Sequence, residues 1–359
     1  MDREGLDMDF SSILIEGIGA IGGVVAGKFI KAGYAPTLVT GNREISEKIN
    51  RNGIGVSTPD EKFTVPAHAI ASLAELDRDD RFDVALLTMK AHRVVEAARD
   101  TLPFLDPEHG FVLTCQNGIV EDAVAGEIGA GRVAAGIIGW GGTMHGPGVY
   151  ERTGPGAIHI GEPDGSRTKR IEKLADILRV VTPVVVSGNI KGAQWGKLAI
   201  NCTITTIGAL TGETLGGMLC DRRVRHAFMS TYREVIDTAL ALGFRPERIA
   251  VNPMLLYVPE SAGAFTRFVK DILVRIAARK HGKLKSSSLQ SLERGRKTEI
   301  DFLNGYVVEQ ARKAGVRTPF NETLTRMIKE IEQGRRSLTP ANMEELLLAP
   351  EKPSIPQPV

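Results

Sequence analysis

The chain has 359 residues, which is enough for two domains that each bury a core. Its 45 lysines and arginines nearly balance 43 aspartates and glutamates, so nucleic acid is not expected as the main partner. The three cysteines show no Cys-x-x-Cys spacing and the seven histidines form no metal-binding pair, which excludes a disulfide framework and makes a metal site unlikely on sequence grounds. With no membrane-length apolar run and no signal-peptide pattern, the sequence predicts a cytoplasmic protein without membrane contact.

The first half of the chain alternates apolar, β-rich runs with helical stretches. Strands are expected at 12–16, 35–40, 82–89, 110–115 and 132–138, with a helix over 21–32. Continuous apolar strands separated by helices predict a Rossmann-type, doubly wound parallel sheet covered on both faces. Two later runs, at 148–152 and 157–161, are interpreted as a hairpin that closes this domain, before a helix over 168–179 and a strand over 183–187.

After this point strand patterns stop and only helical periodicity remains. The sequence therefore predicts a dinucleotide-binding domain over residues 10–188 and an all-helical substrate and catalytic domain over 189–335. Expected helices include 224–242, 262–279 and 299–314. The proline-rich end, residues 336–359, is predicted to be a disordered tail or an arm that clasps a partner.

A glycine-rich turn follows the first predicted strand and opens the first helix. In this context Gly-x-Gly-x-x-Gly indicates dinucleotide binding. Gly17 allows the tight turn, Gly19 lets the backbone approach a pyrophosphate, and Gly22 lets the helix pack on the strand. The cofactor-binding run comprises Gly17, Ile18, Gly19, Ala20, Ile21 and Gly22.

The end of the second predicted strand bears on the choice between NAD and NADP. No acid directly follows the strand, where an NAD-binding protein places one for the ribose. Instead Thr40, Asn42 and Arg43 could hold a 2′-phosphate, Arg43 through its fork of donors. NADP(H) is therefore the preferred cofactor, while Glu44 keeps NAD(H) possible.

Polar residues also follow two later strands, at the sheet edge where ligands of such folds bind. Lys90 could contact the cofactor or the substrate, and Asn117 could hydrogen-bond the nicotinamide or its ribose. The competing interpretations are a solvated lysine at a helix start and an ordinary Asn117-Gly118 turn.

Lys197 lies in an apolar helical segment with Asn201 four residues later, which places both on one helix face. An ammonium beside an amide can bind and protonate a carbonyl oxygen. The alternative is an amphipathic core helix with Lys197 at its rim. Farther along, Thr298 could cap a helix with Glu299 in its first turn, either opposite Lys197 or on an ordinary surface helix.

Taken together, these motifs resemble the ketopantoate reductase (2-dehydropantoate 2-reductase) family from Ile13 to about Gln333. The ordered motifs are the glycine turn, Met-Lys-Ala around Lys90, Gln-Asn-Gly at 116–118, Lys-Leu-Ala-Ile-Asn at 197–201 and Thr-Glu-Ile-Asp at 298–301. The resemblance implies NADPH-dependent reduction of a 2-keto acid in the pantothenate pathway to coenzyme A.

By the same resemblance, Lys197 looks like the catalytic lysine that protonates the carbonyl oxygen, and Glu299 like the carboxylate that holds the substrate hydroxyl and orients Lys197. Asn201 matches a substrate-binding amide and Ser287 a serine that binds the substrate carboxylate. Lys90 and Asn117 match positions on the cofactor side.

Two positions depart from the family pattern. Thr205 stands where a second asparagine often binds the polar end of the substrate, which implies a wider pocket or a different substrate tail. Thr40 stands where an arginine often ends the second strand. Alternatives are therefore a relative acting on another or bulkier keto acid, or a catalytically silent NADPH-binding sensor. A homodimer is a further expectation.

Overall fold

The computed structural model describes residues 12–349 except 250, 281 and 283–284. These residues form two compact units. Unit 1 comprises the chain up to Gln116 together with Val120–Ile190, and unit 2 comprises Asn117–Ile119 together with the chain from Lys191 onward. The short segment Asn117–Ile119 thus belongs by its contacts to the helical unit, although it directly follows a strand of the sheet unit.

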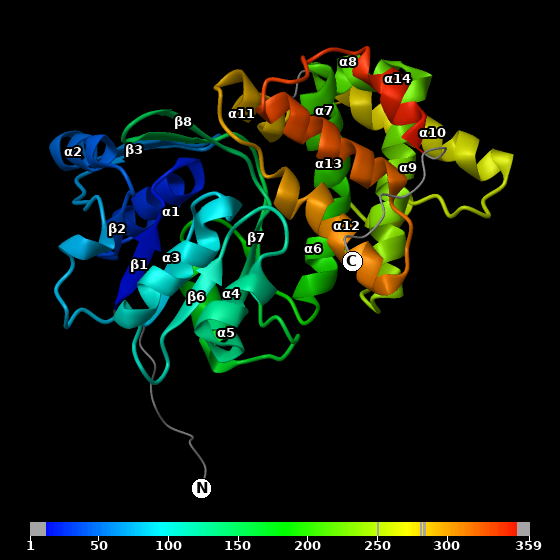
Figure 1. The fold of residues 1–359 in the computed structure, drawn as a ribbon. Coiled ribbons are helices and arrows are strands. Elements are labelled where there is room, and N and C mark those ends of the chain that lie inside the picture. The colour runs from blue at the N-terminus through cyan, green and yellow to red at the C-terminus, as the bar shows by residue number, and fades with distance from the viewer. Residues whose placement is uncertain (1–11, 250, 281, 283–284, 350–359) are drawn as a thin grey trace, which may run out of the picture. The chain divides into compact units, whose positions relative to one another are not determined.

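Unit 1 is built on a seven-stranded sheet (Figure 1). In spatial order the strands are β11 (Val184–Val186), β10 (Ile158–Gly161), β7 (Val133–Ile138), β6 (Phe111–Thr114), β5 (Val84–Leu87), β1 (Ile13–Glu16) and β2 (Thr37–Val39). All neighbours are parallel except β7 and β10, which are antiparallel. Every residue of β5, β6 and β7 is buried. Because successive side chains point to opposite faces, both faces of the sheet are covered, as predicted.

The helices of unit 1 connect these strands. They are α1 (Ala20–Lys31), α2 (Arg43–Asn52), α3 (Val94–Thr101), α4 (Glu121–Ile128) and α5 (Lys169–Leu178), with 3₁₀ turns η1 (Leu73–Glu75), η2 (Ala91–Arg93), η3 (Leu102–Phe104) and η4 (Ala130–Arg132). The alternation of strand and helix confirms the predicted Rossmann-type, doubly wound architecture.

A second sheet of four strands was not expected from the sequence. Its order is β4 (Lys62–Val65), β3 (Ile54–Ser57), β9 (Val149–Arg152) and β8 (Gly142–Gly146). The predicted hairpin between 148–152 and 157–161 is therefore wrong. β9 pairs with β3 and β8, whereas β10 pairs with β7 and β11 in the larger sheet. The physical reason is burial: Tyr150 of β9 packs against α1, and all of β10 is buried in the main sheet.

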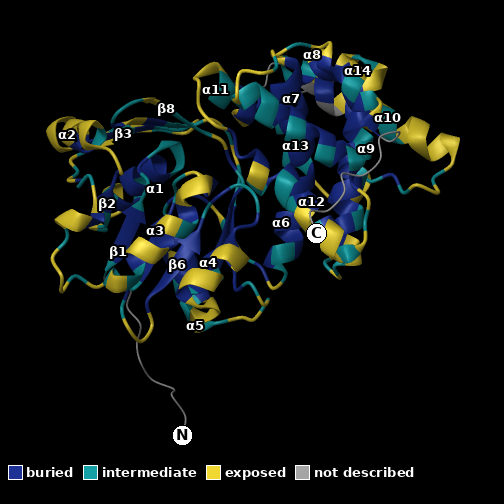
Figure 2. Ribbon diagram, viewed as in Figure 1, coloured by how far each residue is buried: buried dark blue, intermediate teal, exposed yellow. Residues whose placement is uncertain are grey.

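Unit 2 is helical in the residues described. It consists of α6 (Ile190–Ile200), the π-helical turn η5 (Asn201–Thr205), α7 (Thr206–Thr211), α8 (Leu215–Cys220), α9 (Arg222–Ala241), η6 (Pro253–Leu255), α10 (Ala264–Lys280), α11 (Ser287–Glu293), η7 (Ile300–Phe302), α12 (Asn304–Ala314), α13 (Pro319–Glu332) and α14 (Asn342–Leu347). Buried residues of α6, α7, α9, α12 and α13 form one continuous core (Figure 2). In the part of the chain that the structure describes, no helix is long and apolar enough to cross a membrane.

The predicted tail over 336–359 requires a correction. Residues Asn342–Leu347 form α14, and Met343, Leu346 and Ala349 are buried in the core of unit 2. The prolines of the segment lie outside α14 and do not interrupt it, and its apolar side chains pack against α7 and α9. Residues 350–359 lie outside the described residues.

Candidate active site

The glycine turn has the geometry that its motif predicts. β1 ends at Glu16 and α1 begins at Ala20. Gly17 has φ of 92°, and a Cβ there would lie 2.6 Å from the backbone nitrogen of Met89. A Cβ on Gly22 would lie 2.6 Å from the carbonyl oxygen of Gly17. Both glycines are therefore required by the protein's own packing.

Gly19 differs from the other two glycines of the motif. Its φ is −92°, and the nearest atom to a Cβ built there is the carbonyl oxygen of Gly17, at 3.9 Å. Neither backbone strain nor packing requires glycine at this position. The missing side chain instead keeps the amino end of α1 open to a close-approaching ligand, and free N–H groups there suit a pyrophosphate. The turn therefore fits a dinucleotide.

Two side chains that the sequence analysis missed hold this turn in place. Thr88, just after β5, donates its hydroxyl to the carbonyl oxygens of Glu16 and Gly17, at 2.9 and 2.8 Å. Tyr150 is buried, donates to the carbonyl of Ile18 at 3.1 Å, and occupies the space that a Cβ on Gly23 would need. Burial raises the pKa of Tyr150 to about 12, so it remains a donor. Neither contact has a local sequence signal, because the partners are far apart in the chain.

Of the three residues proposed for a 2′-phosphate, two have local structural roles. Thr40 is buried and its hydroxyl donates to the carbonyl of Asn42 at 2.7 Å. The side chain of Asn42 accepts a hydrogen bond from the N–H of Ile45 and thereby caps α2. Arg43 begins α2, is exposed, and forms no ion pair with any residue that the structure describes. Arg43 is therefore the one side chain of this group that is available to an anion.

At the ends of β5 and β6, Gln116 has a structural role. Its amide nitrogen donates to the carbonyls of Leu87 and Met89 at 2.7 and 3.0 Å, and its oxygen accepts from the N–H of Cys115. This clamp fixes the backbone just before Asn117. Lys90 is exposed and immediately precedes η2.

Two of the predicted site residues meet within unit 2. The amide nitrogen of Asn117 donates to a carboxylate oxygen of Glu299 across 3.5 Å. Glu299 is buried, and it precedes η7 instead of lying in the first turn of a long helix as expected. Thr298 caps this turn by accepting from the N–H of Ile300, and its own hydroxyl donates to Glu332 at 2.7 Å. The carboxylate of Glu299 is thus held at a defined place.

Lys197 lies near the end of α6. It is partly exposed, whereas both adjacent residues, Gly196 and Leu198, are buried. The helix continues through the π-helical turn η5, which contains both Asn201 and Thr205. Such turns leave backbone groups without the ordinary helical partner and are frequent at functional sites. The predicted four-residue spacing of Lys197 and Asn201 therefore lies at the junction of an α-helix and a π turn.

Asn304 supplies the missing partner of this turn. Its amide nitrogen donates to the carbonyl of Cys202 at 3.0 Å and to the side-chain oxygen of Asn321 at 2.9 Å. Its oxygen accepts from the hydroxyl of Thr206 at 2.7 Å. Asn304 and Asn321 are fully buried. Asn304 was not predicted from the sequence, because nothing in the chain around it reveals partners 98 and 102 residues away.

Glu234 of α9 anchors the far end of the same network. Its carboxylate accepts hydrogen bonds from the backbone N–H groups of Phe320 and Asn321 and from the side-chain amide of Asn321. Burial raises the pKa of Glu234 to about 7, although these donors pull it down. Three helices are therefore joined to η5 by buried polar contacts.

Thr205, Ser286 and Ser287 make different contacts. The hydroxyl of Thr205 donates to the carbonyl of Asn201 at 2.6 Å. Ser287 is exposed at the start of α11. Its neighbour Ser286 is buried, caps α11 and donates to the carbonyl of Thr205 at 3.0 Å. Ser286 is thus the serine that the structure joins to the π turn.

A Rossmann-type unit with this glycine turn, followed by a helical unit, defines a class of two-domain nucleotide-dependent oxidoreductases. Comparison with known families narrows the class. Residues 13–165 match the family model described as ketopantoate reductase PanE/ApbA, and residues 189–332 match the model of its C-terminal domain. The chain therefore belongs to the ketopantoate reductase family, whose members are oxidoreductases that act on CH–OH groups.

Individual relatives agree with this assignment. A 2-dehydropantoate 2-reductase of Mesorhizobium japonicum is 28% identical over 342 residues, covering 89% of this chain and 97% of the relative. A protein of the same name from Pyrococcus horikoshii is 27% identical, with the same coverage. The crystal structure of a family member from Ralstonia eutropha superposes with a TM-score of 0.75 at 25% identity, covering 91% of this chain and all of that one. A ternary structure of D-mandelate dehydrogenase with NADH shares the fold, with a TM-score of 0.77 at 20% identity, covering 90% and 99%.

Proposed function

We propose that this protein reduces a 2-keto acid to the 2-hydroxy acid with NADPH as the hydride donor. The observation that carries the proposal is the Asn117–Glu299 hydrogen bond. It joins Asn117, which is proposed for the cofactor side, to the carboxylate that is proposed to hold the substrate. Asn117 and Glu299 are 182 residues apart in the sequence and yet are hydrogen-bonded, as residues of a single site would be.

In the proposed mechanism, the glycine turn from Gly17 to Gly22 would hold NADPH, which when bound would supply a hydride to the carbonyl carbon. Negative charge then develops on the carbonyl oxygen, where the ammonium of Lys197 stabilises it and donates a proton. Glu299 accepts a hydrogen bond from the substrate's hydroxyl group and orients Lys197, while Asn201 holds the substrate. Ser287 is the proposed contact for the substrate carboxylate, and Lys90 and Asn117 are assigned to the cofactor side.

The preferred substrate is 2-dehydropantoate, which gives pantoate on the route to coenzyme A. The curated relatives named 2-dehydropantoate 2-reductase support this choice. A second candidate is a different or bulkier 2-keto acid. It is favoured by Thr205, whose hydroxyl donates to the Asn201 carbonyl and so is not a free donor for a polar substrate tail. The ternary structure of D-mandelate dehydrogenase, which has a similar fold, contains NADH and anilino(oxo)acetate, so an aromatic keto acid is included in the test panel.

The test follows NADPH and NADH oxidation at 340 nm with 2-dehydropantoate, branched 2-keto acids and an aromatic 2-keto acid. We expect turnover of at least one, with NADPH preferred. Lys197→Ala should lower kcat by roughly 10²–10⁴-fold, because it removes the proton donor. Lys313→Ala is the control, since Lys313 is an exposed lysine of α12 paired with Glu309. No turnover of any keto acid would overturn the activity, and a loss below tenfold would remove Lys197 from its role.

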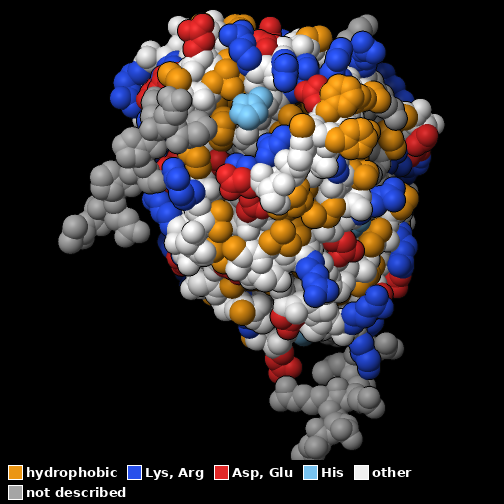
Figure 3. All heavy atoms as spheres, turned by 90° about the vertical axis from the view of Figure 1, so that its right-hand side faces the viewer, with side chains coloured by type: hydrophobic (Ala, Val, Ile, Leu, Met, Phe, Trp, Pro, Cys, Tyr) orange, Lys and Arg blue, Asp and Glu red, His pale blue; other side chains and the backbone are white. Residues whose placement is uncertain are grey.

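We also propose that the protein forms a homodimer through α10. The helix buries Val274 and Ala278, yet Phe265, Val269, Ile272 and Ile276 are exposed. Their spacing of four, three and four residues is typical of the apolar seam between two paired helices. Hydrophobic side chains gather on the face of unit 2 that Figure 3 shows. An antiparallel pair of α10 helices would place Phe265 of one copy against Ile276 of the other, which makes the seam self-complementary.

A further inference from the structure

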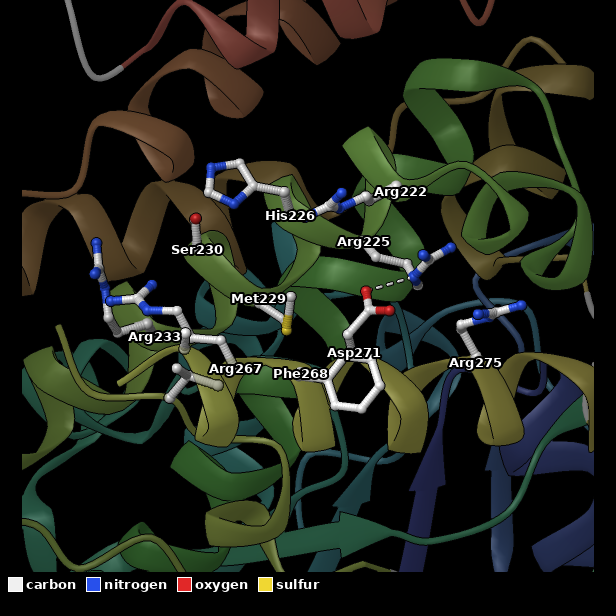
Figure 4. Close-up of a pocket in the computed structure, with 12 residues that line it drawn as sticks. Arg222, Arg225, His226, Met229, Ser230, Arg233, Arg267, Phe268, Asp271 and Arg275 are labelled. Atoms are coloured by element: carbon white, nitrogen blue, oxygen red, sulfur yellow. Dashed lines mark hydrogen bonds and ion pairs between the residues drawn. The ribbon is translucent and has the colours of Figure 1, made fainter. Parts of the chain in front are cut away.

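A cavity of about 500 Å³ lies between α9 and α10 in unit 2. Five arginines and one aspartate supply the charges of its lining, and it contains none of the residues proposed for the keto-acid site. Figure 4 shows its side chains, which come from α9, α10 and Val258. The charged residues of the lining are Arg222, Arg225, His226, Arg233, Arg267, Asp271 and Arg275.

One pair within the cavity is structural. Arg225 is buried and donates to Asp271 at 2.6 Å, and it also donates to the carbonyls of Leu219 and Cys220. This pair ties α9 to α10. It also uses the single carboxylate of the lining, so that Asp271 does not neutralise the other arginines.

The remaining cations are poorly compensated. Arg222 and Arg275 are exposed and form no ion pair with any residue of the described chain. Arg233 approaches a carboxylate oxygen of Asp237 only to 3.9 Å. Arg267 donates to two backbone carbonyls, those of Glu260 and Ala262. These hydrogen bonds hold the guanidinium in position, but they do not neutralise it because a carbonyl group has no net charge.

The positive charges of this cluster affect the protonation of His226. Its pKa is lowered, first by burial and then by the charges of Arg267 and Arg233. Like charges that face one another across a cavity repel, and an anion bound among them removes that repulsion. Arginine is also the side chain best suited to phosphate, because its planar fork can donate two parallel hydrogen bonds to one group.

Apolar side chains also line the cavity, and one of them, Phe268, is exposed. Figure 4 shows Met229 of α9 and Phe268 of α10 near its middle, with Arg233 and Arg267 toward one side and Arg225, Asp271 and Arg275 toward the other. A volume of this size suits a small molecule. An inorganic ion would leave the Met229 and Phe268 surfaces uncovered, whereas a ligand with an apolar part would cover them.

We propose that the cavity between α9 and α10 binds a small organic phosphate, with the phosphate on the arginines and an apolar group on Met229 and Phe268. The assignment does not depend on the keto-acid reductase activity. It rests on three observations. The arginines of the lining outnumber its one carboxylate, Asp271, and Arg222 and Arg275 form no ion pair with any described residue. The apolar side chains of Met229 and Phe268 lie between the charged groups.

The test is calorimetric titration of the full-length protein with phenyl phosphate, carried out with and without excess NADPH. The NADPH arm occupies any nucleotide site, so that binding which persists there belongs to another place. We expect phenyl phosphate to bind in both arms, and phenol and inorganic phosphate to bind more weakly. Arg222→Gln with Arg275→Gln should weaken phenyl phosphate binding by roughly tenfold or more, because two charge-assisted donors are removed.

Arg317→Gln is the matched control, since it removes an exposed arginine of the same unit outside the cavity. Its affinity for phenyl phosphate should equal that of the wild type. Unchanged melting temperatures of both variants establish that they fold. The proposal is overturned if phenyl phosphate fails to bind in the NADPH arm, if the double variant binds as tightly as the control, or if inorganic phosphate binds as tightly as phenyl phosphate.

Discussion

Gly17 and Gly19 stand two residues apart, and each is glycine for a different physical reason. At Gly17 the backbone has positive φ and the space is filled by the Met89 backbone, whereas at Gly19 the space beside the backbone is open. The fold requires the first glycine, and we propose that the approach of a ligand requires the second.

Alanine at the two positions should therefore have opposite signatures. Gly17→Ala should lower the melting temperature strongly, because it combines strained φ with overlap of fixed backbone. Gly19→Ala should leave the melting temperature near that of the wild type and weaken NADPH binding. Thermal unfolding and fluorescence titration with NADPH measure the two effects. A Gly19→Ala protein with wild-type NADPH affinity would contradict the assignment of this turn.

Arg43 gives the second prediction at the residue scale. Because Arg43 is the available cation at the start of α2, Arg43→Ala should raise the KM for NADPH by roughly ten- to a hundredfold while changing the KM for NADH little. Arg51→Ala, in the last turn of the same helix, is the control for helix stability and net charge. If Arg43→Ala raised the KM for NADPH and the KM for NADH equally, the guanidinium would not bind the 2′-phosphate.

The sequence identifies some of these residues and not others. Gly17 and Gly22 were predicted from their motif, because a glycine turn between strand and helix has a local signature. Tyr150, Ser286 and Asn304 were not predicted. Their roles depend on partners in distant elements, and a buried tyrosine, serine or asparagine reads as an ordinary core or cap residue until those partners are known.

At the scale of elements, η5 is the most important for the proposed substrate site, because it contains both Asn201 and Thr205. The apolar periodicity of 194–210 predicts a continuous helix and contains no sign of a π turn. Within the turn, the carbonyl of Cys202 accepts a hydrogen bond from the side-chain amide of Asn304, and Asn304 also accepts one from the hydroxyl of Thr206, which begins α7. We therefore propose that Asn304 positions the turn that carries the proposed substrate-binding residues.

Asn304→Ala should lower the free energy of unfolding by about 2–4 kcal/mol, because it leaves the Cys202 carbonyl and the Thr206 hydroxyl buried without partners. It should also lower kcat by a larger factor than it raises the KM for NADPH. Asn342→Ala removes a comparable buried amide, one that donates to Leu210 and Ser337 and lies outside this network. Asn342→Ala should destabilise the protein without that loss of kcat. Equal kcat in the two variants would reduce Asn304 to a purely structural role.

At the scale of the whole molecule, the sequence predicts the alternation of strands and helices along the first half of the chain and the change to an all-helical region. It does not predict the second sheet. β3 and β9 are short and pair across a long stretch of chain, so their partners cannot be read from local alternation. For the same reason α14 was expected to belong to a disordered tail, since its stability comes from the core that it completes.

The proposed dimer is also a property of the whole molecule. Light scattering after size-exclusion chromatography should give twice the monomer mass for the wild type. Ile276→Lys should give a monomer, because it places a charge in the α10 seam. Leu348→Lys is the control, as Leu348 is similarly exposed and lies outside α10. A monomeric wild type, or a dimeric Ile276→Lys protein, would exclude the α10 interface.

The hydrogen bond from Tyr150 to Ile18 has a consequence for the order of events during synthesis. Its partners are separated by 132 residues, so at typical elongation rates the tyrosine leaves the ribosome about 7 to 26 seconds after the turn that it supports. Until then the first β-α-β unit carries its glycine turn without the ring that fills the space beside Gly23. The nascent chain should therefore acquire affinity for the dinucleotide late, only after β9 has joined β3.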